Sequence, residues 1–401
     1  MAKSIFKNAY KSGKNDPIQY FSVEIYDVDL SVVNGIKRII QSEINLPGFY
    51  GEDNPTVNIF ENNGPLHNEI LSHRIGLIPI HFNDDEVETY NHEDYLFELE
   101  VENDTASMMN VTTEQMKVFK KGSLVDKAEI KRLFPANPLT NSYILITRLR
   151  PKEKLHFKAT AMLGTAGEYA GFSPVSLCTF HYLEDPKLIA HLPYTATILD
   201  RERSYLRNEY GDPTAIKFEL EIECGLTAKY LVSKAIEVFM NKLNKTLNEV
   251  MSDNSDYISI VKPDSGNGYK FVFENETDTL GNFLQSNMHN YYIRAKNLTT
   301  FNKTMTYVGY MCPHPLEKTM ELMIIISENK INSSSSSSGE SDATGTTTNS
   351  TDTTTTTSGG GNKNPMKFAT NKSEYIEVLS EQCRRSLSYL QEIKSQWLLS
   401  V

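Results

Sequence analysis

Hydrophobic residues recur along this chain with two different periods, and the order of these patterns outlines the fold. The run at 18–28 (IQYFSVEIYDV) is rich in β-forming residues and predicts a strand. Ser31 follows as the expected N-cap of a helix, because its hydroxyl can accept a hydrogen bond from a backbone N–H group. The helix is expected to end near Pro47 and Gly48. Its apolar stripe, at spacings of three and four residues, is formed by Val32, Val33, Ile36, Ile39 and Ile40.

Residues 49–190 show a different pattern, in which short β-like runs alternate with turn residues. Runs such as YLFELEVEND, SYILITRLRP and LHFKATAM have the composition of strands. The stretch at 113–134 contains a glycine and fits either strands or a helix. We therefore expect residues 49–190 to form a β-rich insert domain with one or two helices.

The strand–helix order then repeats. A strand over 214–223 precedes an amphipathic helix over 227–251, after which residues 252–268 are expected to be a linker. A further strand and a helix capped by Asp278 or Thr279 follow, and then two more strands. The order of elements in the last third of the chain thus resembles the order at its beginning.

Low complexity interrupts this second set of elements. Residues 328–370 consist mainly of Ser, Thr, Gly and Asn, and they hold too little apolar surface to offset their ordering entropy, so we expect disorder. A terminal helix is expected within 371–401. Its apolar seam is formed by Ile376, Leu379, Cys383, Leu387, Leu390, Ile393 and Trp397. A helix packed within the fold is favoured over a coiled-coil strand, because the seam is only about three heptads long.

Two helix starts share one arrangement of residues. SVVNGIKRIIQS (31–42) and TLGNFLQSNMHN (279–290) each have a hydroxyl residue, then Asn three positions later, then an apolar helical pattern. This similarity predicts a pseudo-symmetric pair of modules, in which each unit buries its helix face against the other. The alternative is that any α+β chain shows two strand–helix units by chance.

Composition narrows the class of protein. The formal net charge of −11 weakens an interpretation as an autonomous duplex-DNA binder, because non-specific affinity comes from Lys and Arg. No apolar run approaches the about 20 residues that span a bilayer, so the chain is expected to be soluble. Four basic residues near the N-terminus are interpreted as a solvated tail: Lys3, Lys7, Lys11 and Lys14.

Candidate chemistry is sparse. The four cysteines form no C-x-x-C pair, which argues against a zinc site and a disulfide framework. The glycines at 164–171 lack the strand–helix context of a phosphate-binding loop, and no D-x-D-x-D cluster is present. Four histidines lie near acidic residues without the spacing of a metal motif, so this region is interpreted as a polar loop: His67, His73, His81 and His92. We therefore expect no active site, metal or cofactor of the chain's own.

Several motifs in collinear order resemble one family. HNEILSHRIGLIPI (67–80), together with VVNGIKRIIQSEI (32–44), resembles the third-largest subunit of multisubunit DNA-directed RNA polymerases. SYILITRLRP, EYAGFSPVSL and YGDPTAIKFELEIECGL match the same family further along. From Asp278 the chain resembles the small partner subunit of the eleventh-subunit type, through DTLGNFLQSNM, VGYMCPHPLE and the terminal helix.

The resemblance implies an α+β fold with two α-like dimerisation modules, each an antiparallel sheet plus helices, fused and paired within one chain. The first module contains the β-rich insert, and the low-complexity tract interrupts the second. The expected domains are 17–48 and 191–251 for the first module, 49–190 for the insert, 252–268 for the linker, 269–327 and 371–401 for the second module, and 328–370 for the disordered insertion.

The resemblance also implies a noncatalytic platform on which the two large polymerase subunits assemble. The expected partners are the largest and second-largest subunits and small zinc-ribbon-like subunits. DNA is reached only through the complex, no membrane is involved, and intramolecular pairing removes the need for a homodimer. The alternative is a stand-alone transcription regulator that binds polymerase or DNA. A fusion of this kind fits a large DNA virus, which would place the chain in the virion and host cytoplasm; otherwise the nucleus is expected.

Two departures from the family pattern affect the expected sites. Many relatives carry a cysteine-rich zinc loop or an iron–sulfur domain after the H-R-I-G-L-I-P block, whereas this chain has no cysteine there. The first basic pair is Lys–Arg, which loses one planar guanidinium fork. The residues expected to contact large subunits are Lys37, Arg38, His73 and Arg74. The residues expected at the intramolecular pairing surface are Ile36, Ile40, Leu280, Phe283, Leu284, Met288, Leu379 and Leu390.

Overall fold

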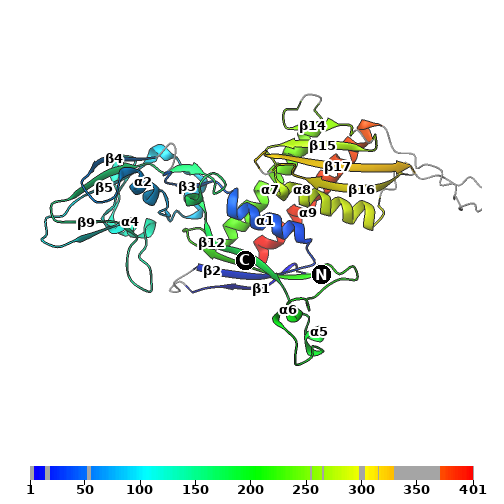
Figure 1. Ribbon diagram of the computed structural model, residues 1–401, viewed down its shortest axis with the longest axis horizontal. Helices are drawn as coiled ribbons and strands as arrows, with labels where there is room; N and C mark the ends of the chain where they lie inside the picture. Colours follow the sequence, from blue (N-terminus) through cyan, green and yellow to red (C-terminus); the bar gives the residue numbers. More distant parts are fainter. Residues whose placement is uncertain are drawn as a thin grey trace, which may run out of the picture. The chain divides into compact units, whose positions relative to one another are not determined.

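The computed structural model describes the protein as two compact units with mixed helices and strands (Figure 1). The first unit comprises Met1–Asn248 and Cys383–Val401, and the second comprises Glu249–Gln382. The described residues are 4–13, 19–51, 56–252, 255–263, 266–297, 303–314, 316–328 and 371–400. The expected disordered insertion, apart from its first residue, lies outside the described residues.

The first unit is built on an antiparallel sheet in the order β1-β2-β13-β12. Its strands are β1 (Phe6–Lys11), β2 (Gln19–Tyr26), β12 (Val175–Tyr182) and β13 (Ala215–Ile222). The expectation of a solvated N-terminal tail is wrong for β1, because its backbone pairs with β2 and Phe6 is buried. Strand β12 lies within the range expected for the insert, yet it pairs with β13 over its whole length. The insert range therefore gives one strand to this sheet.

Helix α1 (Leu30–Ser42) packs on β12 of this sheet, and helix α7 (Ala228–Val250) packs against α1. The apolar stripe of α1 is buried, but the N-cap is Asp29 rather than Ser31. The Asp29 carboxylate accepts a hydrogen bond from the Ser31 backbone N–H at 2.8 Å, and a charged acceptor binds an N–H more strongly than a hydroxyl does. The two helices approach closely at Gly35, where a Cβ would lie 2.5 Å from the Phe239 ring.

The remaining elements of the first unit form a β-rich domain between α1 and β12, and a short helical connection between β12 and β13. The main sheet of the β-rich domain has the order β4-β10-β5-β7-β8. The ambiguous stretch at 113–134 contains both kinds of structure, since β7, β8 and α4 fall within it. The elements are β3 (Leu46–Gly48), β4 (Val57–Asn62), α2 (Asn68–Gly76), α3 (Asp84–Glu88), β5 (Tyr95–Glu102), β6 (Met109–Thr112), β7 (Lys117–Lys120), β8 (Ser123–Leu124), α4 (Lys127–Leu133), β9 (Leu145–Leu149), β10 (Lys154–Ala159), β11 (Met162–Gly164), α5 (Pro186–Ala190) and α6 (Ile198–Glu202).

The second unit has its own antiparallel sheet, in the order β14-β15-β17-β16. Its strands are β14 (Ile258–Val261), β15 (Tyr269–Glu274), β16 (Lys303–Met311) and β17 (Thr319–Glu328). Helix α8 (Asp278–Met288) packs on β16 and β17 and continues into a π-helical turn at His289–Arg294. The cap of α8 is Thr277, one residue before the two candidates, because its side chain accepts from the Thr279 N–H. Strand β14 lies within the segment expected to be a linker and pairs with β15.

The last helix of the chain, α9 (Lys372–Ser400), ends in the core of the first unit. Trp397 is almost fully buried there, with its ring 5.2 Å from the ring of Phe6 and 5.7 Å from that of Phe21, both edge-on. Its indole Nε1–H donates a hydrogen bond to the Lys229 carbonyl oxygen at 3.1 Å. One aromatic side chain thus ties α9 to β1, β2 and α7.

Polar contacts fix the same part of α9. Lys394 Nζ lies 2.6 Å from a carboxylate oxygen of Glu237 on α7. The Tyr389 hydroxyl accepts a hydrogen bond from the Asp29 backbone N–H at the start of α1, at 3.4 Å. Burial raises the pKa of Tyr389 to about 12, so the hydroxyl keeps its proton at neutral pH. Residues after 382 therefore complete the unit that the first 248 residues begin.

Candidate subunit-interface sites

The two residues predicted on α1 lie half-buried next to β12. Lys37 Nζ lies 5.3 Å from the centroid of the Phe180 ring, which is within cation–π range. One turn further along, Gln41 Nε2 donates a hydrogen bond to the Cys178 carbonyl oxygen at 3.3 Å. The amino group of Lys37 is therefore directed along β12. A contact of Lys37 or Arg38 with a large subunit stays a prediction.

The other predicted pair lies at the end of α2. Arg74 is exposed, and its guanidinium is fixed by two backbone carbonyls of β9. Nε donates to the Ile146 oxygen at 3.0 Å, and Nη2 donates to the Leu145 oxygen at 2.9 Å. His73 is half-buried, and its carbonyl oxygen accepts from the Tyr169 hydroxyl at 3.5 Å. Arg74 thus has a structural role, and its guanidinium faces solvent in a fixed orientation.

The two glycine-containing motifs of the insert meet at one place. Gly76, from HRIGLIP, lies against Gly51, and a Cβ on Gly76 would approach the Gly51 nitrogen to 2.8 Å and the Tyr169 hydroxyl to 2.6 Å. A Cβ on Gly171, from EYAGFSP, would overlap the Gly76 carbonyl oxygen. Glycine is needed here because three backbone segments touch with no room for a side chain. The motifs are therefore linked by packing, which their separation in the sequence does not reveal.

A carboxylate of the insert holds the start of α7. Asp84, in α3, accepts hydrogen bonds from the Thr227 backbone N–H at 2.9 Å and from the Thr227 hydroxyl at 2.6 Å. Glu88, one turn later, accepts from Lys234 Nζ at 2.6 Å and from the Tyr230 hydroxyl at 2.8 Å. Both acidic groups lie near the N-terminal end of α7, where the helix dipole favours negative charge. The sequence around Asp84 predicts a polar loop, and no local pattern there indicates the contacts with α7.

We expect Asp84→Ala to lower the free energy of unfolding of the first unit by about 2 kcal/mol, because two hydrogen bonds to a charged acceptor are lost. Urea denaturation followed by circular dichroism measures this change. Asp85→Ala is the matched control, since Asp85 is the exposed neighbour in the same helix and should change stability by less than about 0.5 kcal/mol. Equal effects of the two substitutions would contradict the role of Asp84.

The histidines expected in a polar loop differ in their surroundings, and His81 is largely buried. Burial lowers the pKa of His81 from 6.5 to about 4, and the positive charge of Arg132 adds to the shift. Arg132 Nη1 also donates to the His81 carbonyl oxygen at 2.9 Å, which keeps the two residues close. Because the unfolded chain binds the proton more readily, acidification between pH 6.5 and 4 favours unfolding.

We expect the free energy of unfolding to fall as the pH drops from 6.5 to 4, with His81 accounting for up to about 3 kcal/mol. His81→Gln removes the titrating group, so this part of the pH dependence should disappear. Denaturant titrations at several pH values between 4.5 and 7 measure it. His92→Gln, at an exposed position in the same domain, should keep the wild-type pH dependence. If His81→Gln also keeps it, His81 is not the group responsible.

The eight residues predicted for pairing are all buried, and they are divided between the two units. Those in the first unit are Ile36, Ile40 and Leu390, and those in the second are Leu280, Phe283, Leu284, Met288 and Leu379. Within the second unit, the buried face of α8 packs on β16 and β17. Burial agrees with an apolar role for each residue, and their part in pairing stays a prediction.

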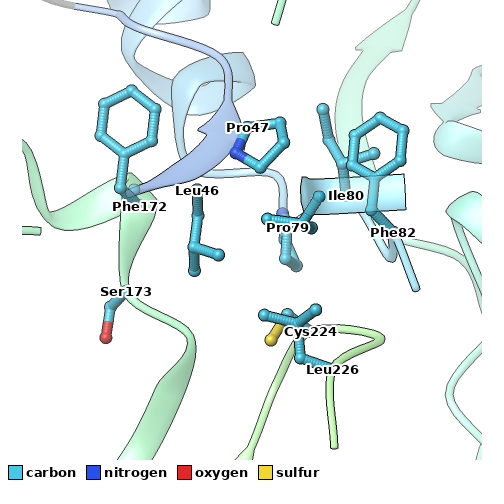
Figure 2. A pocket seen from close by; sticks show the side chains of 11 residues that line it. Leu46, Pro47, Pro79, Ile80, Phe82, Phe172, Ser173, Cys224 and Leu226 are labelled. Carbon is cyan, nitrogen blue, oxygen red and sulfur yellow. The ribbon is translucent and has the colours of Figure 1, made fainter. Parts of the chain in front are cut away.

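Two cavities of the first unit differ widely in size. One is an open hollow of about 1190 Å³ beside β12 and the helical connection that follows it, lined by residues such as Phe180, Tyr182, Pro186 and Leu206. Figure 2 shows the other, an apolar cavity where the insert joins α7, lined by residues such as Leu46, Pro79, Phe172 and Leu226. Its free volume of about 20 Å³ suits one water, whereas ligand pockets measure about 300–1,000 Å³. Cys224 borders it, and burial raises the pKa of this thiol to about 12.

In the described part of the chain, no group of three His, Cys, Asp or Glu side chains is arranged to hold a metal ion. None of the helices described in the structure has both the length and the apolar character needed to cross a bilayer. The cysteines that are buried, Cys178, Cys224 and Cys383, all have pKa values raised to about 12 by burial, which keeps them protonated at neutral pH.

These features define a mixed α/β protein with several antiparallel sheets, an architecture compatible with an α-like polymerase subunit. No family model matches the chain. The DNA-directed RNA polymerase subunit Rpo3 of Methanobrevibacter smithii is 29% identical over 174 residues, covering 42% of this chain and 56% of the relative. Subunit RPAC1 of DNA-directed RNA polymerases I and III from Saccharomyces cerevisiae is 28% identical over 183 residues, covering 40% of this chain and 52% of the relative.

A longer match is with subunit Rpo3 of Thermococcus kodakarensis, which is 25% identical over 254 residues, covering 56% of this chain and 90% of the relative. The chain spans about half the length of the first two relatives. Its homologues are thus α-like subunits of DNA-directed RNA polymerases, and this supports the role of a polymerase subunit.

Proposed function

We propose that this chain is a noncatalytic platform subunit of a DNA-directed RNA polymerase, on which the two large subunits assemble. The observation that carries the proposal is the homology to Rpo3 and RPAC1, which extends over about 40–56% of the chain. The regulator alternative has no comparable support, because the relatives named above are polymerase subunits.

We further infer that the chain joins two α-like modules that pair intramolecularly. The support comes from α9, whose C-terminal part belongs to the first unit while its beginning belongs to the second. Trp397, Lys394 and Tyr389 bind elements from the first 248 residues. A linker between the modules raises the effective concentration of one module around the other, and this favours pairing within the chain. The chain would then need no second copy of itself for the two modules to pair. An origin in a large DNA virus stays a separate prediction.

Co-expression with the two large polymerase subunits and the small zinc-ribbon-like subunits of the same genome tests the platform role. We expect one stable complex that contains both large subunits and small zinc-ribbon-like subunits. If the full chain fails to bind either large subunit, the platform role is wrong. Light scattering of the isolated chain tests pairing separately, with a monomer of 45.4 kDa expected at micromolar concentration. A tight homodimer without detectable monomer would contradict intramolecular pairing.

A further inference from the structure

One face of α2 exposes large apolar side chains around the fixed guanidinium of Arg74. Ile70 is 50% exposed and Leu77, the C-cap of the helix, is 58% exposed. With Arg74 they follow spacings of four and three residues, which place all three on one side of a helix. We call these three residues the α2 face. Arg74 is among the residues expected at the interface with large subunits, whereas Ile70 and Leu77 are not, although their helical spacing is visible in the sequence.

The guanidinium of Arg74 is held in place without a carboxylate. Two of its five N–H groups donate to neutral carbonyls of β9. In the part of the chain that the structure describes, no Asp or Glu pairs with Arg74. Arg148, which is exposed two residues further along β9 from Ile146, likewise forms no ion pair with a described residue. Because the guanidinium of Arg74 is already fixed, a ligand that binds it would cause little further loss of side-chain entropy.

We propose that the α2 face binds a polypeptide segment that carries one Asp or Glu between apolar side chains. The carboxylate would pair with the outward N–H groups of Arg74, a geometry that arginine favours because its donors form a planar fork. Apolar side chains of the segment would cover Ile70 and Leu77. The proposal rests on the proposed function in one respect, which is that the segment belongs to a large polymerase subunit.

Charge complementarity favours this partner over nucleic acid. A phosphate backbone requires several cations along its length, and this chain has a net charge of −11. A single carboxylate requires only one fixed guanidinium, and a nucleic-acid backbone would leave Ile70 and Leu77 without an apolar partner. An acidic and apolar protein segment satisfies all three side chains at once.

Binding of the full chain to the two purified large subunits tests the proposal. We expect Leu77→Ser to weaken binding about tenfold or more, because the substitution removes apolar surface that the segment would bury. Arg74→Gln should weaken binding to a similar extent and reduce its dependence on salt concentration. Leu124→Ser is the matched control, because Leu124 on β8 is also 58% exposed, and it should bind like the wild type.

The outcomes separate the two proposals. If the wild type binds neither large subunit, the proposed function fails. If the wild type binds and Leu77→Ser and Arg74→Gln bind equally well, the function stands and the α2 face is not a docking site. If Arg74→Gln instead loses binding to a 20-base-pair duplex while its subunit affinity is unchanged, the partner is nucleic acid and the proposal is overturned.

A photo-crosslinker identifies the segment directly and does not depend on how Arg74→Gln folds. With p-benzoylphenylalanine in place of Leu77, the assembled complex should crosslink to a peptide of a large subunit that has Asp or Glu within about five residues. A complex that forms without a crosslink at this position, or a crosslink to a segment without acidic residues, would reject the proposal.

Discussion

Trp397→Ala should destabilise the first unit by about 4 kcal/mol, one of the largest single effects in this chain. The indole is 1% exposed and fills the space between Phe6, Phe21 and α7. Truncation of a buried tryptophan removes apolar burial and leaves a cavity, which together cost about 3–5 kcal/mol. It also leaves the Lys229 carbonyl without its indole donor. Thermal and urea denaturation of the full chain measure the loss.

The control lies two residues away on the same helix. Leu399 is 88% exposed, so Leu399→Ala should change stability by less than about 0.5 kcal/mol. A small effect of Trp397→Ala, close to that of the control, would mean that α9 does not contribute to the core of the first unit. Support for the fused arrangement would then weaken as well, because α9 carries that inference.

Phe283→Asp should unfold the second unit. The Phe283 side chain is fully buried on the face of α8 that packs on the sheet of this unit. The substitution removes a large apolar side chain at about 3–5 kcal/mol and places an unpaired carboxylate in an apolar environment at several kcal/mol more. Their sum approaches the total stability of a typical domain, about 5–15 kcal/mol. Leu284→Asp, at the adjacent buried position, should act in the same way.

Limited proteolysis and circular dichroism of the full chain report the unfolding. Asn282→Asp provides the matched control, because Asn282 precedes Phe283 on α8 but is only half-buried. This control introduces the same charge on the same helix and should leave the second unit folded. Unchanged melting of Phe283→Asp would mean that the buried face of α8 is assigned to the wrong residues.

The local patterns of the sequence predicted the helices α1, α7, α8 and α9, and the errors at α1 and α8 concern their ends. The stripe of Val32, Ile36 and Ile40 marks the buried face of α1, because a helix repeats every 3.6 residues whatever surrounds it. The cap moved from Ser31 to Asp29 because several polar residues near a helix start compete for the same N–H groups. In the second unit the same competition moved the cap to Thr277.

Strand pairing was harder to predict than helix position. The β1 strand was interpreted as a charged tail, because only Phe6 among its residues is buried and the other positions are exposed. Its place in the sheet depends on pairing with β2 and on packing against Trp397, which lies at the other end of the chain. Long-range partners of this kind leave no periodic pattern in the strand itself.

On the α2 face, too, the sequence predicted local features and gave no indication of long-range contacts. The H-R-I-G-L-I-P motif drew attention to His73 and Arg74, and the helical spacing of Ile70 and Leu77 was readable beside them. The carbonyls that fix Arg74 belong to Leu145 and Ile146, which lie 71 and 72 positions further along the chain. No local pattern could indicate contacts over such a separation. Likewise, the acidic run at Asp84 gave no sign that it binds Thr227, the residue that precedes α7 and lies 143 positions later.

The sequence by itself determined the periodicities, the resemblance to polymerase subunits and the residue types available at each site, because these depend on local order along the chain. The tertiary structure decided which of those residues are exposed and which charged side chains are hydrogen-bonded within the fold. It also decided which segments, distant in the sequence, pack together in each core. The end of α9 illustrates the reason. Its apolar seam is a local property, but the surface that buries Trp397 is built from β1, β2 and α7, and only folding brings these segments together.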